Sequence, residues 1–460
     1  MKAIAKANAS ARSDFSVGSI PGTILRLSGP LILAQLINAL YNIVDRVFIG
    51  RIPEVGSLAL TGLGVCCPFI MIVSAFAQLA GMGGAPLASI ARGEGDDRGA
   101  ERILGNSFTL SLIFGVVLTV VMLLIKDKAL YWVGASGDTF AYANEYLTIY
   151  LLGSPFVMIS LGINAFISVQ GFARVSMMTV LVGAVVNIVL DPILIFVLGM
   201  GVRGAALATV ISQALSAVWV LRFLTGKRCV LPLKRAAMRP DGKVIRRVLS
   251  LGLSTFVMSV NDSLVSIACN SSLQLHGGDL YVGVMTVVSS VRQVLTMPLH
   301  GFSQAAMPVL GYNYGAKRYR RVREAALFTL YVSLGFSAVV QAVAMLAPAT
   351  LFRLFTDDAA LIAAGAPLTR IYFAMFVFMG FQMMGQRCFV SMGRAKKAIF
   401  FSLLRKAFIV APLTLLLPYV GGLGVEGVFW AEPVSDFVGP VACFVTFMVT
   451  EWGKLKEEPV

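Results

Sequence analysis

Three aspartates lie inside long apolar stretches of the sequence, where a charge needs a specific reason to be present. Asp45 follows Tyr41 by four residues, so one helix would carry both side chains on the same face. Asp191 ends the segment NIVLD, four residues after Asn187, and Asp262 lies in a serine-rich segment. A charge at the centre of a membrane helix costs about 2.5–3.5 kcal/mol on insertion scales. We therefore take these residues as candidates for a functional site.

The chemistry expected of such carboxylates is reversible neutralisation. Poor solvation disfavours the ionised form, so a proton, Na⁺ or an organic cation competes for the same oxygens. This competition is what an obligatory exchange of cations requires. Tyr41, Asn187 and Thr209 are expected to add hydrogen bonds or oxygen ligands around Asp45 and Asp191, where a transient Na⁺ is the one metal anticipated.

Each aspartate also has a purely structural interpretation. Asp45 and its neighbour Arg46 could form a surface pair at the membrane interface. Asp191 could satisfy backbone groups that Pro192 leaves without partners. Asp262 could belong to a generally polar face between helices.

The elements that must position these residues are membrane helices. Of 460 residues, 57% are hydrophobic and only 13% charged, and no charged residue occurs between Glu54 and Arg92. Apolar stretches of 18 or more residues indicate membrane-spanning helices, which excludes a soluble enzyme, a disordered protein and a disulfide-rich secreted protein. The expected spans are 24–45, 57–82, 103–125, 142–166, 176–198, 203–223, 246–270, 281–306, 325–347, 363–386, 399–420 and 425–449.

The net charge of +15 reflects membrane topology. With twelve spans, the tails and even-numbered loops hold 29 of the 38 Lys and Arg residues. Such an excess marks the cytoplasmic side, which places both termini in the cytoplasm and argues against a nucleic-acid partner.

The sequence also contains an internal repeat. At an offset of 222 residues, Pro86 falls on Pro308 and Gly171 on Gly393; at 223, the segment 201–212 falls on 424–435. We expect an all-α polytopic membrane protein with twelve helices in two pseudo-symmetric six-helix lobes, arranged as a parallel repeat. The expected divisions are an N-lobe, a basic cytoplasmic linker, a C-lobe and a cytoplasmic tail, at 1–225, 226–244, 245–450 and 451–460.

Two arginines fall inside the expected spans. Arg292 and Arg387 could favour anionic substrates in a cavity, or Arg292 could form a buried pair with Asp262. Counted in this way, the membrane interior holds three acids and two bases.

Further candidates come from a helix bend and from a run of soft side chains. Pro30, fifteen residues before Asp45, is expected to be a hinge in the first helix. Gln382 and Gln386 lie in a Met- and Phe-rich segment that could line a promiscuous cavity, or could face lipid.

The six cysteines and two histidines show no metal-ligand spacing, and no nucleophile motif is present. We therefore expect neither an enzyme nor a bound cofactor.

Four segments carry a resemblance to a known family: YNIVDRVFIGR (41–51), NIVLDPILIFVLGMGVRGAALATVISQ (187–213), QGFAR (170–174) and SMGRAKKA (391–398). With them, the whole chain resembles the multidrug and toxic compound extrusion (MATE) family, in a bacterial-type branch with acidic residues in the N-lobe. The resemblance implies export of bulky, often cationic drugs across the plasma (bacterial inner) membrane, driven by H⁺ or Na⁺.

The resemblance also implies roles for individual residues. The N-lobe acidic pair maps onto Asp45 and Asp191, with Asn187 and Thr209 as polar companions, and a helix-7 acid of some branches aligns with Asp262. The helix-10 acid of other branches has no counterpart here, which moves the expected cation site to the N-lobe. A monomer in contact with membrane lipids is expected to suffice.

Two other functions remain open from the sequence. A flippase-type exporter of a lipid-linked or anionic metabolite would need a strongly basic cavity. A membrane-embedded enzyme would need catalytic clusters that the spans do not contain.

Overall fold

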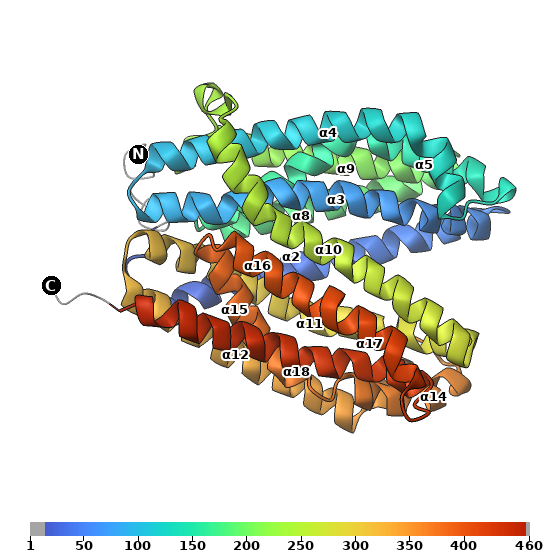
Figure 1. Ribbon diagram of the computed structural model, residues 1–460. Helices are drawn as coiled ribbons and strands as arrows, with labels where there is room; N and C mark the ends of the chain where they lie inside the picture. Colours follow the sequence, from blue (N-terminus) through green and yellow to red (C-terminus); the bar gives the residue numbers. More distant parts are fainter. Residues whose placement is uncertain (1–13, 457–460) are drawn as a thin grey trace. The chain divides into compact units, whose positions relative to one another are not determined.

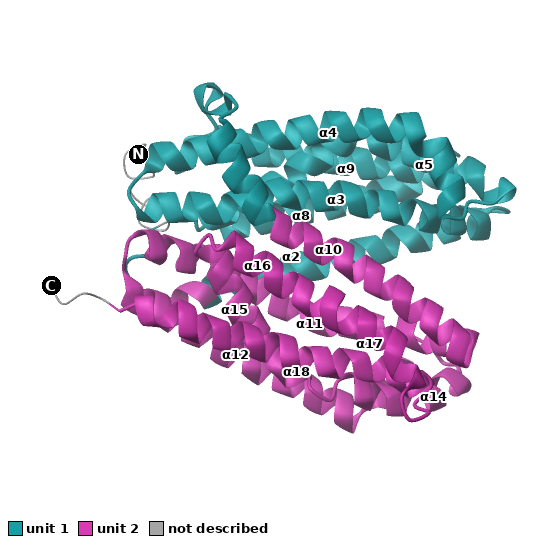
Figure 2. Cartoon of the chain, in the orientation of Figure 1, with its two compact units in different colours: residues 1–17, 25–252 teal, residues 18–24, 253–460 magenta. Residues whose placement is uncertain are grey.

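Every regular element in residues 14–456, the part of the chain that this computed structural model describes, is a helix (Figure 1). The chain forms two compact units, coloured separately in Figure 2. Unit 1 contains residues 1–17 and 25–252 and unit 2 contains residues 18–24 and 253–460, as far as each range is described. Lys2, Lys6 and Arg12, three of the basic N-terminal residues that indicate the topology, and tail residues 457–460 lie outside the described residues.

Unit 1 contains most of α2 and the helices that follow it up to the start of α10. Their bounds are α2 Ile20–Gly50, α3 Gly56–Gly93, α4 Asp97–Val133, α5 Gly137–Leu152, α6 Ser154–Val157, the π-helix η1 Met158–Ile163, α7 Ala165–Val169, α8 Ala173–Pro192, the π-helix η2 Ile193–Val197, α9 Gly201–Leu224 and the 3₁₀ helix η3 Arg235–Met238.

Unit 2 contains most of α10 and all later elements. Their bounds are α10 Gly242–Gly277, α11 Asp279–Gly315, α12 Tyr319–Leu346, α13 Pro348–Arg353, α14 Ala359–Tyr372, η4 Phe376–Phe378, α15 Met379–Ser391, α16 Ala395–Leu403, the π-helix η5 Leu404–Val410, α17 Ala411–Leu416, η6 Leu417–Tyr419, α18 Val425–Thr450 and η7 Trp452–Lys454.

The two units repeat the same order of helices in a nearly constant register. Four helices of the second half begin 222 or 223 residues after their counterparts: α10 after α2, α11 after α3, α12 after α4 and α14 after α5. The turns repeat as well, because Gly171 and Gly393 both have a positive φ, of 86° and 70°. Glycine adopts this backbone conformation without the steric cost that a side chain brings. The predicted pseudo-symmetric two-lobe fold is confirmed.

Ten described helices are long and apolar enough to span a membrane, and two bent pairs raise the number to twelve if each pair is one span. The bent pairs are 137–169, with an angle of 57°, and 359–391, with an angle of 49°. The prediction of twelve spans is therefore consistent with the structure. The predicted spans at 142–166 and 363–386 coincide with these two bent pairs.

A proline explains the first break, and side-chain hydrogen bonds to the backbone stabilise the second. Pro155 lies at the start of α6 and lacks the N–H that would continue the ladder of α5. At the second break, the Gln341 side chain of α12 donates to the carbonyl of Ala374 and accepts from the N–H of Val377. Backbone groups that a broken helix exposes must find such partners in the membrane.

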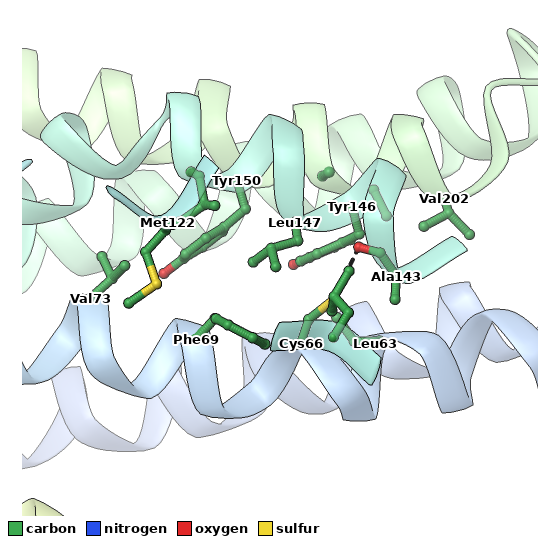
Figure 3. Close-up of a cluster of buried hydrophobic side chains, with 14 of the residues drawn as sticks. Leu63, Cys66, Phe69, Val73, Met122, Ala143, Tyr146, Leu147, Tyr150 and Val202 are labelled. Carbon is green, nitrogen blue, oxygen red and sulfur yellow. Dashed lines mark hydrogen bonds between the residues drawn. The ribbon is translucent and has the colours of Figure 1, made fainter. Parts of the chain in front are cut away.

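The core of unit 1 lies between α3, α4 and α5, where Phe69, Met122 and Leu147 pack together (Figure 3). Within this core the Cys66 thiol donates to the carbonyl of Ala143 across 3.3 Å. The helices approach closely where residues are small. A Cβ on Gly81 would lie 2.2 Å from the carbonyl oxygen of Gly162, so only glycine fits there.

The basic segment between α9 and α10 belongs to unit 1 and packs against its helices. The Gln170 side-chain oxygen accepts hydrogen bonds from the N–H groups of Val230 and Leu231, at 3.0 and 2.8 Å, and from the Cys229 thiol at 3.1 Å. Further along the segment, the Thr109 hydroxyl donates to the carbonyl of Met238 at 2.8 Å. The segment is thus held by buried hydrogen bonds to the helices beside it.

Burial of Cys229 in this contact gives the first prediction. Burial raises the pKa of the Cys229 thiol to about 12, and the thiolate is the form that reacts with maleimides. In a version whose only cysteine is Cys229, Gln170→Ala should release the segment and return the pKa towards its ordinary value. Labelling at pH 8 should then accelerate at least about tenfold, since each pKa unit changes the thiolate fraction about tenfold.

The measurement is the rate of labelling by a fluorescent maleimide in purified protein. Gln274→Ala, at an exposed glutamine of α10, is the control. Equal rates in the two variants would show that Gln170 does not hold the segment.

Candidate functional site

Unit 1 contains a polar cavity of about 290 Å³ among α2, α3, α5, η1, α8 and α9. Its wall includes one carboxylate, that of Asp45, together with Asn38, Tyr41 and Asn42 from the same helix. Hydroxyl and amide groups line much of the remaining wall: Ser74, Ser160, Thr179, Thr209, Ser212, Gln213 and Ser216. The cavity thus combines one acid with many neutral groups that donate or accept hydrogen bonds.

Asp45 is buried in this wall, with 8% of its surface exposed. Its neighbour Arg46 also lines the cavity, although the arginine is exposed. No ion pair joins the two residues among those that the structure describes. The polar face of α2 that Tyr41, Asn42 and Asp45 form therefore turns towards the cavity.

Asp191 lies behind the cavity wall, fully buried at the end of α8. The Asn187 amide donates to Asp191 Oδ1 at 3.4 Å and to Thr209 Oγ1 at 3.5 Å, and Thr209 lines the cavity. Asp191 also lies close enough to Asp45 for their two negative charges to repel each other. These contacts bring together four of the residues that the sequence nominated.

The local sequence explains why the chain bends beside Asp191. Pro192 follows it and lacks an N–H, and the backbone then continues as the π-helix η2. Such π segments are frequent at functional sites, because they re-aim side chains within a helix.

Several oxygens of this group have no hydrogen-bond partner in the described part of the chain. They are Oδ1 of Asp45, Oδ2 of Asp191 and Oδ1 of Asn187, each shielded from solvent. Buried polar atoms are normally paired, so each exception needs an explanation. All three atoms are acceptors, which fits a proton or a bound cation and does not fit an anion.

Two tyrosines of α5 form another side of the cavity. The rings of Tyr146 and Tyr150 are nearly parallel, with centroids 6.3 Å apart, and they lie between α5 and α3 (Figure 3). An aromatic surface beside a carboxylate is suited to flat organic cations, which ring faces attract. These tyrosines were not among the residues predicted from the sequence, although their i, i+4 spacing places them on one helix face.

Unit 2 contains a second group of charges with a different organisation. Asp436 of α18 accepts from Arg292 at 3.0 Å and from Arg405 at 2.6 Å. Glu432, one turn earlier, lies 3.0 Å from both Arg292 and Lys406. Here the buried acids are paired with buried bases.

This group corrects the predicted pairing of Arg292 with Asp262. Arg292 pairs with Glu432 and Asp436, whereas Asp262 is half-exposed and lies 3.7 Å from Lys406. The count of three acids and two bases within the membrane was also wrong. Glu432, Asp436, Arg405 and Lys406 lie in α18 and η5, which belong to candidate spans.

The sequence contained a signal for these missed residues. Glu432 and Asp436 are four residues apart inside an apolar stretch, the same spacing that drew attention to Asn187 and Asp191. Arg405 and Lys406 were assigned to the cytoplasmic end of their span, as the positive-inside rule suggests for basic residues.

The remaining candidates of unit 2 make contacts between helices. Gln382 is buried and donates to Gln386 at 3.5 Å, while the Gln386 amide donates to the carbonyl of Ala398 and to the Ser402 hydroxyl. Arg387 donates to the Ser303 hydroxyl at 3.1 Å. Gln386 therefore joins α15 to α16, and neither glutamine lines the cavity of unit 1.

Comparison with known proteins connects this geometry to a family. The MatE family model matches residues 30–193 and 255–416, which is well over half of the chain. The chain belongs to the MatE family. The predicted resemblance to multidrug and toxic compound extrusion proteins is confirmed.

The relatives of this MatE protein match it over nearly their whole length. The multidrug export protein MepA of Staphylococcus haemolyticus (strain JCSC1435) is 24% identical over 424 residues, 92% of each chain. A crystal structure of a MATE protein in complex with MaD3S has a TM-score of 0.87 and 26% identity, over 95% of this chain and 96% of that one. An outward-facing MATE transporter of the MOP superfamily has a TM-score of 0.88 and 25% identity, over 96% and 98%.

No group of three or more His, Cys, Asp and Glu side chains that could hold a metal ion occurs in the portion of this MatE protein that is described. A cation at Asp45 and Asp191 would need most of its ligands from neutral oxygens, as Na⁺ accepts.

The contrast between the unpaired acids of unit 1 and the paired acids of unit 2 gives the second prediction. Asp191→Asn removes a buried charge that has no ion-pair partner among the described residues, so the variant should be more stable to unfolding at pH 8 by about 1–2 kcal/mol. Glu432→Gln breaks buried ion pairs and should lose about 3–5 kcal/mol. The gain from Asp191→Asn should shrink in acid, where a proton neutralises the wild-type carboxylate.

Thermal unfolding of the purified variants in detergent measures both effects. The conservative Thr209→Ser, which keeps the hydroxyl, serves as the control and should melt close to the wild type. A lower unfolding temperature for Asp191→Asn at pH 8 would mean that this carboxylate is compensated in the folded protein.

Proposed function

We propose that this chain is a multidrug efflux antiporter that exports bulky organic, mostly cationic compounds by alternating access, in exchange for H⁺ or Na⁺. The observation that carries the proposal is the buried, unpartnered oxygen of Asp45 in the wall of a polar cavity. Membership of the MatE family and the likeness to proteins named multidrug export protein support it.

Asp45 and Asp191 are the proposed exchange site. An entering H⁺ or Na⁺ neutralises the pair, and an organic cation that takes its place does the same. Asn187, Thr209 and Tyr41 supply polar contacts around the two carboxylates. Asp262 is the secondary candidate, because its half-exposed carboxylate is accessible but lies close to Lys406.

The number of exchanged ions decides the driving force. One H⁺ returned for one exported monovalent cation moves no net charge, so only the pH difference drives such a cycle. Each additional proton gains about 2.3 kcal/mol per 100 mV of membrane potential. With two carboxylates in one lobe, the site has one carboxylate for each of two protons.

The remaining predictions from the sequence complete the proposal. The protein lies in the plasma (bacterial inner) membrane with both termini in the cytoplasm, and it functions as a monomer among lipids. It neither catalyses a reaction nor carries a cofactor. Lobes at 1–225 and 245–450, a linker at 226–244 and a tail at 451–460 are the proposed functional divisions.

Transport in proteoliposomes gives the third prediction. Ethidium uptake should follow an imposed pH gradient or an imposed Na⁺ gradient, and the effective gradient identifies the coupling ion. Asp45→Asn and Asp191→Asn should each lower gradient-driven uptake at least about tenfold, because neither amide can exchange a proton for a cation. Asp127→Asn, at an exposed carboxylate near the end of α4, is the matched control.

The outcomes separate the possible mechanisms. Uptake that survives both substitutions would move the exchange site to Asp262. Folded protein that moves no ethidium under either gradient would contradict the proposal and favour a flippase-type exporter of a lipid-linked or anionic metabolite.

Pro30 lies inside the long helix α2 and is the proposed hinge of the cycle, which gives the fourth prediction. Pro30→Ala restores the missing backbone donor and should straighten the helix. Transport should slow severalfold and its pH dependence should shift, while ethidium binding is kept. Unchanged transport at every pH would remove Pro30 from the mechanism.

A further inference from the structure

The charged residues of unit 2 lie at sequence positions that correspond, through the internal repeat, to positions lining the cavity of unit 1. The register that relates the helices also relates these side chains, at offsets of 222 residues for three pairs and 223 for two. The pairs are Ile70 with Arg292, Gly183 with Arg405, Ala184 with Lys406, Thr209 with Glu432, and Gln213 with Asp436. Unit 2 thus carries ionised side chains where unit 1 carries small or neutral residues around open space.

Lys406 makes the net charge of this cluster zero. Glu432, Asp436 and Asp262 bring three negative charges, and Arg292, Arg405 and Lys406 bring three positive charges, within 2.6 to 3.8 Å of one another. The cluster is neutral only while the lysine is present. Without it, Glu432 would lose its contact with the ammonium and the half-exposed Asp262 would lose its ion pair, so one negative charge of the cluster would be uncompensated.

The three basic residues are held to different degrees. Arg292 is fixed by two carboxylates, and its guanidinium also lies 5.3 Å from the ring centres of Tyr372 and Phe376. Arg405 contacts Asp436 and donates to the Met379 sulfur. Lys406 has a single close contact, with Glu432 at 3.0 Å, and a longer one with Asp262 at 3.7 Å.

The side chains of the cluster differ in exposure, and one carboxylate oxygen has no partner among the described residues. The Asp262 side chain is 50% exposed, whereas that of Lys406 is 11% exposed, so Asp262 connects the ammonium to the outside of the cluster. Asp436 is fully buried and its Oδ2 has no partner in the described residues. A cation in place of the ammonium would meet oxygens of two carboxylates, those of Glu432 and Asp262.

We propose that unit 2 contains a second site for a monovalent cation, built by Glu432 and Asp262, which the Lys406 ammonium occupies as a tethered internal cation. The tether keeps the site filled, so free cations exchange only in unit 1. Replacing Lys406 by a neutral residue opens the site to a small ammonium ion, and the fitting probe is methylammonium, which matches the lysine head group. The inference rests on the charges of unit 2 and does not depend on transport.

The test measures cation binding in the full-length protein with the unit 1 site silenced by Asp45→Asn and Asp191→Asn. In this background we expect no saturable binding of radiolabelled methylammonium by equilibrium dialysis. Adding Lys406→Ala should create saturable binding of one methylammonium per chain. The same variant should unfold at a lower temperature, and methylammonium chloride should restore most of the loss, whereas choline chloride at equal ionic strength should not.

Three further variants locate the effect. Lys406→Arg keeps the site filled and should bind no methylammonium, and Lys396→Ala, at an exposed lysine of α16, should behave like the parent. Glu432→Gln combined with Lys406→Ala removes the acid as well as the base and should abolish the gained binding. Lys406→Met, which keeps the apolar stem, repeats the test with less change in packing.

Several results would overturn the proposal. One is a folded Lys406→Ala protein that binds no more methylammonium than the parent. Another is gained binding that persists when Glu432→Gln and Asp262→Asn are both added. Failure of both Lys406→Ala and Lys406→Met to fold in methylammonium would count against it equally, because an external ammonium would then not replace the lysine. Since the unit 1 acids are absent throughout, none of these results bears on the proposed antiport.

Discussion

The structure depends on one constraint: inside a membrane no water compensates a buried charge, so each charge needs a protein partner, a proton or a bound ion. The two units meet this constraint in opposite ways. Unit 2 surrounds Glu432 and Asp436 with Arg292, Arg405 and Lys406, so its charges compensate one another. In unit 1, oxygens of Asp45 and Asp191 have no partner among the described residues, and a cavity lies beside them. Compensation there must come from something that binds, which is the basis of the proposed exchange.

The same constraint governs the backbone. The interruptions within spans occur where the exposed groups find partners, as at the break before η4, where Gln341 bonds both a carbonyl and an N–H. The π-helices η2 and η5 follow Asp191–Pro192 in one unit and contain Arg405 and Lys406 in the other. Irregular backbone and charged side chains therefore coincide in both units, since a change in helical winding turns a polar side chain towards the inside.

The repeat separates the fold from the site. Glycine turns and helix starts recur at a nearly constant offset, so the packing of each unit has kept the same plan. The side chains that face inward have not, as the replacement of Thr209 and Gln213 by Glu432 and Asp436 shows. Close packing of the helices depends on glycines such as Gly81, whereas the chemistry depends on a few inward-facing side chains. The inward-facing side chains can therefore differ between the units while the helix packing stays the same.

The sequence by itself determined the membrane helices, the two-lobe repeat and the family, because hydropathy, charge asymmetry and turn glycines are local properties that survive without knowledge of packing. It also nominated Asp45, Asn187, Asp191 and Thr209, since a polar residue in an apolar stretch is visible in one dimension. Only the tertiary structure decided the partners. Arg292 meets Asp436 across 144 residues of chain, and no local pattern distinguishes that contact from the expected one with Asp262. Whether a buried acid is paired or free depends on which helices pack against it, and that is a property of the fold.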